Sequence, residues 1–100
     1  MKFEVELAEK ADRDLRNIFF YIAVDLSAPE NAERQINRLW DAILSLDELP
    51  ERYRRYEDEP WYSRGMRVLP IDNFVILYIP YLEEKVVRIV TVMNGGRDIS

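Results

Sequence analysis

Residues 63–81 read SRGMRVLPIDNFVILYIPY, and this stretch decides the fold. Its second part, Phe74 to Ile79, is a run of six residues that are nearly all β-branched or aromatic. Such a run favours a strand that is buried on both faces. Asp72-Asn73 supplies turn residues that join this strand to an earlier one over Gly65 to Leu69. The stretch therefore predicts two adjacent strands of a sheet, with two arginines at the entrance.

Two further strands are predicted at the ends of the chain. Lys2 to Leu7 alternates apolar and charged side chains with period two, which indicates a strand with one wet face. Lys85 to Met93 follows a short reversal at residues 82–84. The connections between the last three strands are too short for parallel crossovers, so these strands form an antiparallel meander.

Two amphipathic helices are predicted between the first strand and the meander, because apolar residues recur there at spacings of three and four. The first stripe is Ala8, Ala11, Leu15, Ile18, Ile22 and Leu26, and the second is Ala32, Ile36, Leu39, Ile43 and Leu46. Phe20 and Tyr21 fall near the edge of the first stripe, where they pack on the second helix or contact a partner. Ser27 and Glu30 have the spacing of a capping box at the start of the second helix. The short connection predicts an antiparallel hairpin.

The element order β-α-α-β-β-β predicts an α+β fold with two layers. The antiparallel helix hairpin packs on one face of a mostly antiparallel four-stranded sheet. One hundred residues suffice for one core, and we expect residues 1–100 to form a single domain.

The composition excludes several classes of protein. Apolar residues make up 48% and charged residues 33%, which suits a compact fold. The absence of cysteine and histidine removes disulfides, thiolate metal sites and the commonest general base. The carboxylates of residues 57–59 lack the spacing of a calcium loop. We therefore expect no metal and no cofactor. No apolar run is long enough for a membrane span, so we expect a cytoplasmic protein without membrane contact.

The net charge of −5 is unevenly distributed. Residues 1–51 hold twelve acidic and six basic side chains, whereas residues 52–100 hold seven acidic and eight basic ones. Positive charge is thus concentrated in the second half, but domains that bind nucleic acid are usually basic overall. We expect no direct sequence-specific binding of nucleic acid.

Residues 51–62, ERYRRYEDEPWY, follow neither period and mix arginines with aromatic residues. Protein interfaces are rich in these residue types, and nucleic-acid surfaces also use them. The acidic run at 57–59 favours a partner protein over RNA or DNA, and an ordered linker without a partner is the third interpretation. The candidate partner-binding residues are Tyr53, Arg55, Tyr56, Trp61 and Tyr62.

One catalytic set remains conceivable. Cleaving RNA through its own 2′-hydroxyl needs positive charge at the phosphate and groups that transfer protons. The candidates are Arg64, Arg67, Tyr78 and Arg97, and they are relevant only if the protein is a ribonuclease. The competing hypothesis is that the arginines pair with the carboxylates of residues 57–59 and hold the loop in place.

The chain resembles the RelE/ParE superfamily of bacterial type II toxin–antitoxin toxins, the plasmid stabilisation proteins. The resemblance covers nearly the whole chain. It rests on four segments in this order: VELAEKADRDLRNIFFYIA at 5–23, AILSLDELPERY at 42–53, SRGMRVLPIDNFVILY at 63–78 and GGRDI at 95–99.

This resemblance implies a growth-inhibiting toxin that a cognate antitoxin protein neutralises. It also implies either poisoning of DNA gyrase through protein binding or ribosome-dependent cleavage of mRNA. The cleaving branch carries an arginine just after the aromatic residue that opens the second meander strand, whereas this chain has Val75 after Phe74. Gyrase poisoning does not depend on such residues and is our leading hypothesis. An mRNA endoribonuclease and a non-toxic binding relative are the alternatives.

Overall fold

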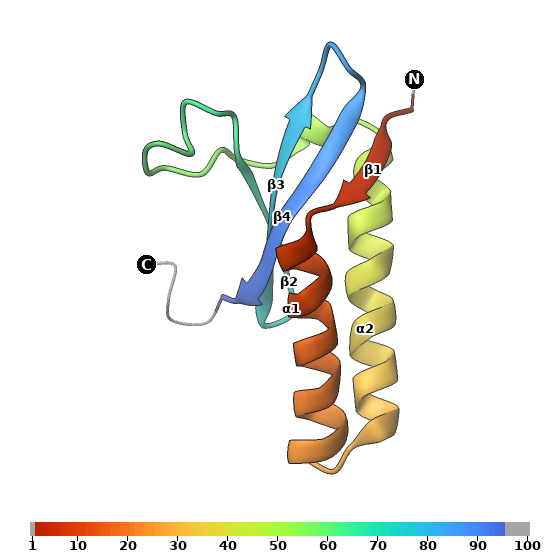
Figure 1. The fold of residues 1–100 in the computed structure, drawn as a ribbon. Helices are drawn as coiled ribbons and strands as arrows, with labels where there is room; N and C mark the ends of the chain where they lie inside the picture. The colour runs from red at the N-terminus through yellow and green to blue at the C-terminus, as the bar shows by residue number, and fades with distance from the viewer. Residues whose placement is uncertain (1, 96–100) are drawn as a thin grey trace.

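The computed structural model describes residues 2–95. The chain runs through strand β1 (Glu4–Leu7), helix α1 (Glu9–Phe20), helix α2 (Pro29–Leu44) and strands β2 (Arg67–Ile71), β3 (Phe74–Tyr81) and β4 (Val86–Asn94). Figure 1 shows the two helices side by side on one face of the sheet, so the predicted α+β architecture is confirmed.

The four strands have the order β1-β4-β3-β2. The pairs β2–β3 and β3–β4 are antiparallel, which confirms the meander, and β1 pairs parallel to β4. The β2–β3 turn is at Asp72 and Asn73 as predicted, and Asp72 takes the left-handed backbone conformation with φ of 55°. Aspartate tolerates this conformation better than most residues because its short polar side chain bonds locally.

Strand β3 is buried on both faces, as its sequence predicts. Ile76 and Tyr78 join the main core beneath the helices, together with side chains such as Leu39 and Ile43. On the opposite face a second, smaller cluster forms around Val75, Leu77, Ile79, Met66 and Val68. The loop before β2 covers this second cluster, so the helices need to cover only one face of the sheet.

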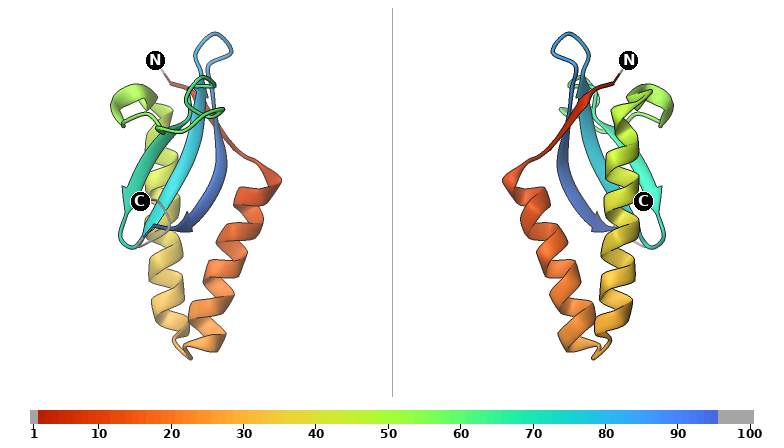
Figure 2. Two further views of the ribbon diagram at one scale, coloured as in Figure 1. Left: turned by 90° about the vertical axis from the view of Figure 1, so that its left-hand side faces the viewer. Right: turned by 90° about the vertical axis from the view of Figure 1, so that its right-hand side faces the viewer.

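The helical hairpin extends past the end of the sheet (Figure 1, Figure 2). A π-helical turn, Tyr21–Asp25, continues α1 into this projecting tip. Leu26, predicted on the buried stripe, is 55% exposed, which makes that prediction wrong. The reason is that the stripe continues beyond the last strand residue on which it could pack.

The predicted capping box at the start of α2 is also wrong. Ala28 is the N-cap residue and no side chain caps the first turn. Ser27 has a left-handed backbone with φ of 53°, and its amide bonds to the carbonyl oxygen of Val24 at 3.1 Å. Ser27 therefore belongs to the tight connection between the helices and does not cap the start of α2.

None of the helices within residues 2–95 combines the length and the apolar character that a membrane crossing needs.

Candidate interaction surfaces

Arg67 and Tyr78 are cross-strand partners in β2 and β3, and both side chains hold the turn that follows α2. The Arg67 guanidinium donates hydrogen bonds to the carbonyl oxygens of Tyr53 at 2.7 Å and Glu51 at 3.1 Å. It also lies 3.5 Å from the Glu51 carboxylate. The Tyr78 hydroxyl donates to the carbonyl oxygen of Pro50 at 2.6 Å. These two residues thus fasten the loop to the sheet.

Tyr78 has no exposed surface. Burial raises the pKa of its hydroxyl from about 10 to about 12, although the nearby Arg67 and Arg52 act in the opposite direction. A buried phenol with a raised pKa, already bonded to a carbonyl oxygen, is poorly placed for proton transfer to a substrate.

Arg64 and Arg97 are the remaining catalytic candidates. Arg64 lies on the loop, with its guanidinium carbon 5.1 Å from the centroid of the Trp61 ring. Arg97 lies outside the described residues. Within residues 2–95, Arg67 pairs with Glu51 rather than with residues 57–59, whereas the charge of Arg55 acts on Glu59. The hypothesis that arginines pair with the acidic run and hold the loop therefore stays a prediction.

Within the acidic run, Glu59 stabilises its own loop. The Glu59 carboxylate accepts hydrogen bonds from the hydroxyl and the amide of Ser63, at 2.6 and 2.9 Å. These bonds hold the pKa of Glu59 below its usual value. The described residues contain no group of three acidic side chains arranged to hold a metal ion.

The five candidate partner residues of the loop divide into two groups. Tyr53 packs against the main core, and Tyr56 and Trp61 pack against the second cluster. Tyr62 is 45% exposed, and the guanidinium of Arg55 stacks 4.2 Å above the centre of its ring. Of the five candidates, Tyr62 is therefore the exposed one, and the half-buried Arg55 stacks on its ring.

Helix α1 borders two grooves that periodicity alone did not predict. The groove between α1 and the end of the sheet, called the inner groove here, has a volume of about 550 Å³. It is lined by Asp14, Asn17, Ile18, Tyr21, Ile22, Leu26, Gln35, Asn73, Phe74, Val92, Met93 and Asn94. Its walls are largely apolar, and amide and carboxylate groups lie among them.

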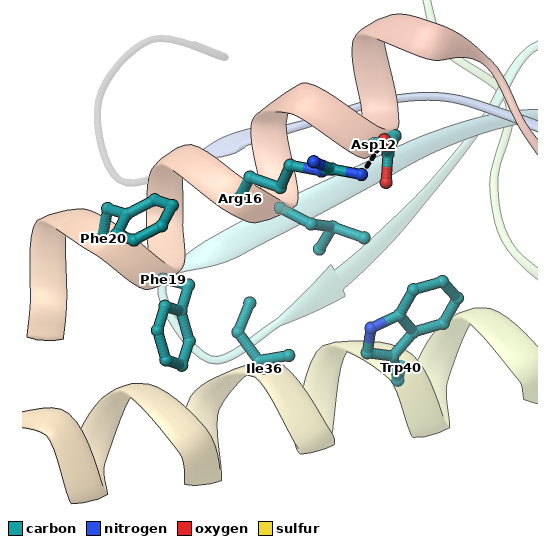
Figure 3. A pocket seen from close by; sticks show the side chains of 7 residues that line it. Asp12, Arg16, Phe19, Phe20, Ile36 and Trp40 are labelled. Carbon is teal, nitrogen blue, oxygen red and sulfur yellow. Dashed lines mark ion pairs between the residues drawn. The ribbon is translucent and has the colours of Figure 1, made fainter.

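The second groove, called the outer groove, lies between α1 and α2 and has a volume of about 330 Å³. Figure 3 views it with the sheet behind the two helices. It is lined by Asp12, Leu15, Arg16, Phe19, Phe20, Ile36 and Trp40, and Asp12 and Arg16 form an ion pair of 3.2 Å at its rim.

Exposed apolar side chains gather at the projecting tip of the hairpin. Phe20, Tyr21, Val24 and Leu26 are each 55–65% exposed. The sequence predicted Phe20 and Tyr21 at the edge of the apolar stripe of the first helix. It did not predict the exposure of Val24 and Leu26. Exposed apolar patches on small proteins mark interaction sites. The fold and these surfaces together define a small α+β protein with an exposed apolar patch at the tip of its helical hairpin.

Solved structures that superpose on this chain include toxins and toxin–antitoxin complexes. A chain of the chromosomal ParDE toxin–antitoxin system of Pseudomonas aeruginosa superposes with a TM-score of 0.76 and 20% identity, covering 93% of this chain and 96% of that one. A chain of a RelBE toxin–antitoxin complex of Mycobacterium tuberculosis gives 0.71 and 18%, covering 96% and 94%. A mutant of the E. coli toxin RelE in the free state gives 0.63 and 14%, covering 94% and 84%.

A sequence profile of the family described as "ParE toxin of type II toxin-antitoxin system, parDE" matches residues 5–99. This protein therefore belongs to the ParE toxin family of type II toxin–antitoxin systems, which confirms the resemblance to the RelE/ParE superfamily. No curated protein sequence matches the chain significantly.

Proposed function

We propose that this toxin acts by binding a target protein, DNA gyrase, and that a cognate antitoxin neutralises it. The observation that carries the proposal is the position of Tyr78, which is fully buried and donates to the carbonyl oxygen of Pro50. A ribonuclease using the candidate set would need this hydroxyl at the scissile phosphate. The function we propose implies a cytoplasmic location, where gyrase works on the chromosome.

The position of Arg67 supports the same conclusion. Its guanidinium is engaged by two backbone carbonyl oxygens and by the Glu51 carboxylate. An arginine that stabilises a phosphate transition state must direct its N–H groups toward that phosphate. The Nη1 and Nη2 groups of Arg67 are directed at the loop, which supports a structural role for this residue.

The inner groove is the best site for the antitoxin. Solved relatives with this fold include the ParDE system and a RelBE complex, in which a toxin and an antitoxin occur together. On this chain the inner groove is the larger of the two beside α1, and exposed Tyr21 and Leu26 lie on its border. An amphipathic segment of an antitoxin can bury apolar side chains there while bonding to Gln35 and Asn73 at the rim.

The experiment is to induce the protein alone in a bacterial host and to follow mRNA integrity and plasmid supercoiling in the same cells. We expect intact transcripts together with altered supercoiling or gyrase-linked DNA breaks. Transcripts cut within codons at translating ribosomes would make the protein an mRNA endoribonuclease instead. Unimpaired growth with folded protein present would make it a non-toxic binding relative.

Two variants sharpen this experiment. Tyr78→Phe removes the proposed proton-transfer group, and the double variant Arg64→Ala/Arg97→Ala removes two candidate phosphate contacts. A gyrase poison should keep its toxicity per folded molecule after Tyr78→Phe and should leave RNA intact in both variants. A ribonuclease should lose about 10²- to 10³-fold in cleavage for each charge contact removed. Circular dichroism on the purified variants separates these effects from unfolding.

A further inference from the structure

Exposed apolar side chains lie near both ends of the outer groove. Phe20 in α1 is 60% exposed at the tip of the hairpin, and its ring stands edge-on to that of Phe19 at 5.7 Å between centroids (Figure 3). Leu44 in α2 is 54% exposed. It lies one helical turn beyond Trp40, away from the tip, because α1 and α2 run antiparallel. Phe20 therefore lines the groove near the tip, and Leu44 lies one turn beyond the lining at the other end, with apolar side chains between them.

The charges along α1 change sign from one turn to the next. Glu9 and Asp12 come first, and Arg13 and Arg16 follow one turn later on the same side of the helix. Within one chain these residues form the ion pairs Glu9–Arg13 at 3.9 Å and Asp12–Arg16 at 3.2 Å. A surface with acidic groups at one end and basic groups at the other is complementary to its own antiparallel copy.

We infer that the outer groove binds a second copy of this chain, in a twofold contact in which the two α1 helices cross antiparallel. Asp12 of each copy then faces Arg16 of the other, since the two residues are about 6 Å apart along the helix. The same twofold axis brings the two ends of the groove together, so Phe20 of one copy reaches Leu44 of the other. Both exposed apolar residues thereby become buried.

This contact leaves the inner groove free. The two grooves share no lining residue, and they lie on opposite sides of α1. A toxin dimer can therefore still bind antitoxin. Because the face is small and its ion pairs are exposed, we expect a weak dimer with a dissociation constant in roughly the micromolar range.

The test uses two charge-reversal variants of the full chain, Asp12→Arg and Arg16→Asp. Each variant places like charges opposite each other across the twofold axis, so each should dimerise at least about tenfold more weakly than the natural chain. When the two are mixed, every pair across the interface has opposite signs again. Sedimentation across a concentration series and native mass spectrometry of the mixture should detect a dimer that contains one copy of each variant.

The matched control is Glu84→Arg, which makes the same change of charge on the β3–β4 turn far from the hairpin. It should dimerise like the natural chain, and thermal melts check that all variants fold. A natural chain that stays monomeric at every concentration overturns the inference. So does a pair of variants that each dimerise normally, or a mixture that forms no mixed dimer although the natural chain dimerises.

Discussion

The carboxylate of Asp14 in α1 accepts a hydrogen bond from the backbone amide of Val92 in β4 at 3.1 Å, and it also accepts one from the hydroxyl of Thr91. Strand β1 ends at Leu7, opposite Ile89, so β4 has no strand neighbour on that side beyond this point. Asp14 bonds to a backbone amide there that would otherwise lack a partner. The contact joins residues 78 positions apart and couples the hairpin to the sheet.

Replacing Asp14 with Ala should lower the free energy of unfolding by about 1–3 kcal/mol, because a partly buried amide and hydroxyl lose their acceptor. Urea unfolding followed by circular dichroism measures this change. Glu9→Ala, an exposed position of the same helix, is the control and should stay within about 0.5 kcal/mol of the natural chain. Equal stability of the two variants would show that the Asp14 contact contributes nothing.

Tyr78→Phe should destabilise the fold by about 1–2 kcal/mol through loss of the bond to the Pro50 carbonyl oxygen. The natural chain should also show a characteristic dependence on pH. Because the pKa of Tyr78 is raised to about 12, the neutral phenol stabilises the folded state fully below its ordinary pKa of about 10. This contribution is lost as the pH rises from the ordinary pKa to the raised pKa of the folded state. Unfolding curves between these two pH values should fall less steeply for Tyr78→Phe, and parallel curves for the two proteins would contradict the prediction.

Asp72 gives the opposite dependence on pH. Its carboxylate accepts two bonds from the Arg38 guanidinium, at 2.8 and 2.9 Å, and one from Gln35 at 2.9 Å. These contacts hold its pKa below the usual value, so its contribution is present at neutral pH and is lost as the pH falls through the acidic range. Asp72→Asn, which tolerates the left-handed backbone, should lower the melting temperature slightly at pH 7. The difference from the natural chain should shrink in acid, and a constant difference would argue against the ion pair.

Tyr21 and Phe20 are neighbouring aromatic residues, but Tyr21 lines the inner groove and Phe20 lines the outer groove. Tyr21→Ala should weaken antitoxin binding by more than about 1 kcal/mol, since it lines the inner groove and is 55% exposed. Phe20→Ala should leave antitoxin affinity nearly unchanged and weaken self-association instead. Isothermal titration with the antitoxin and sedimentation of the toxin alone measure the two effects. A larger loss of antitoxin affinity for Phe20→Ala would move the antitoxin to the outer groove.

Substitutions of Tyr62 and Trp61 distinguish a role of the loop in partner binding from a role in folding. Tyr62→Ala should leave thermal stability almost unchanged and weaken binding of the target or the antitoxin, because the Tyr62 ring is 45% exposed. Trp61→Ala should lower stability as well, because Trp61 packs against the second cluster. If binding per folded molecule is the same for both variants and the natural chain, the loop is structural and contacts no partner.

The sequence by itself determined the secondary structure of this protein and the class of its fold. Periods of two and of three to four residues placed the strands and helices, and the apolar run of β3 predicted burial on both faces. These properties are local, because the geometry of a single helix or strand determines which of its side chains lie on the same face. The position of the β2–β3 turn at Asp72 and Asn73 was predicted correctly for the same reason.

Only the tertiary structure decided what the candidate site residues contact. Arg67 and Tyr78 suggested chemistry in the sequence, but their partners are backbone carbonyl oxygens 14 to 28 residues away, which no periodic pattern encodes. The exposure of Leu26 likewise depends on where the sheet ends relative to the hairpin. Whether a polar or apolar side chain is available to a partner is set by contacts distant in the sequence, and those form only when the chain has folded.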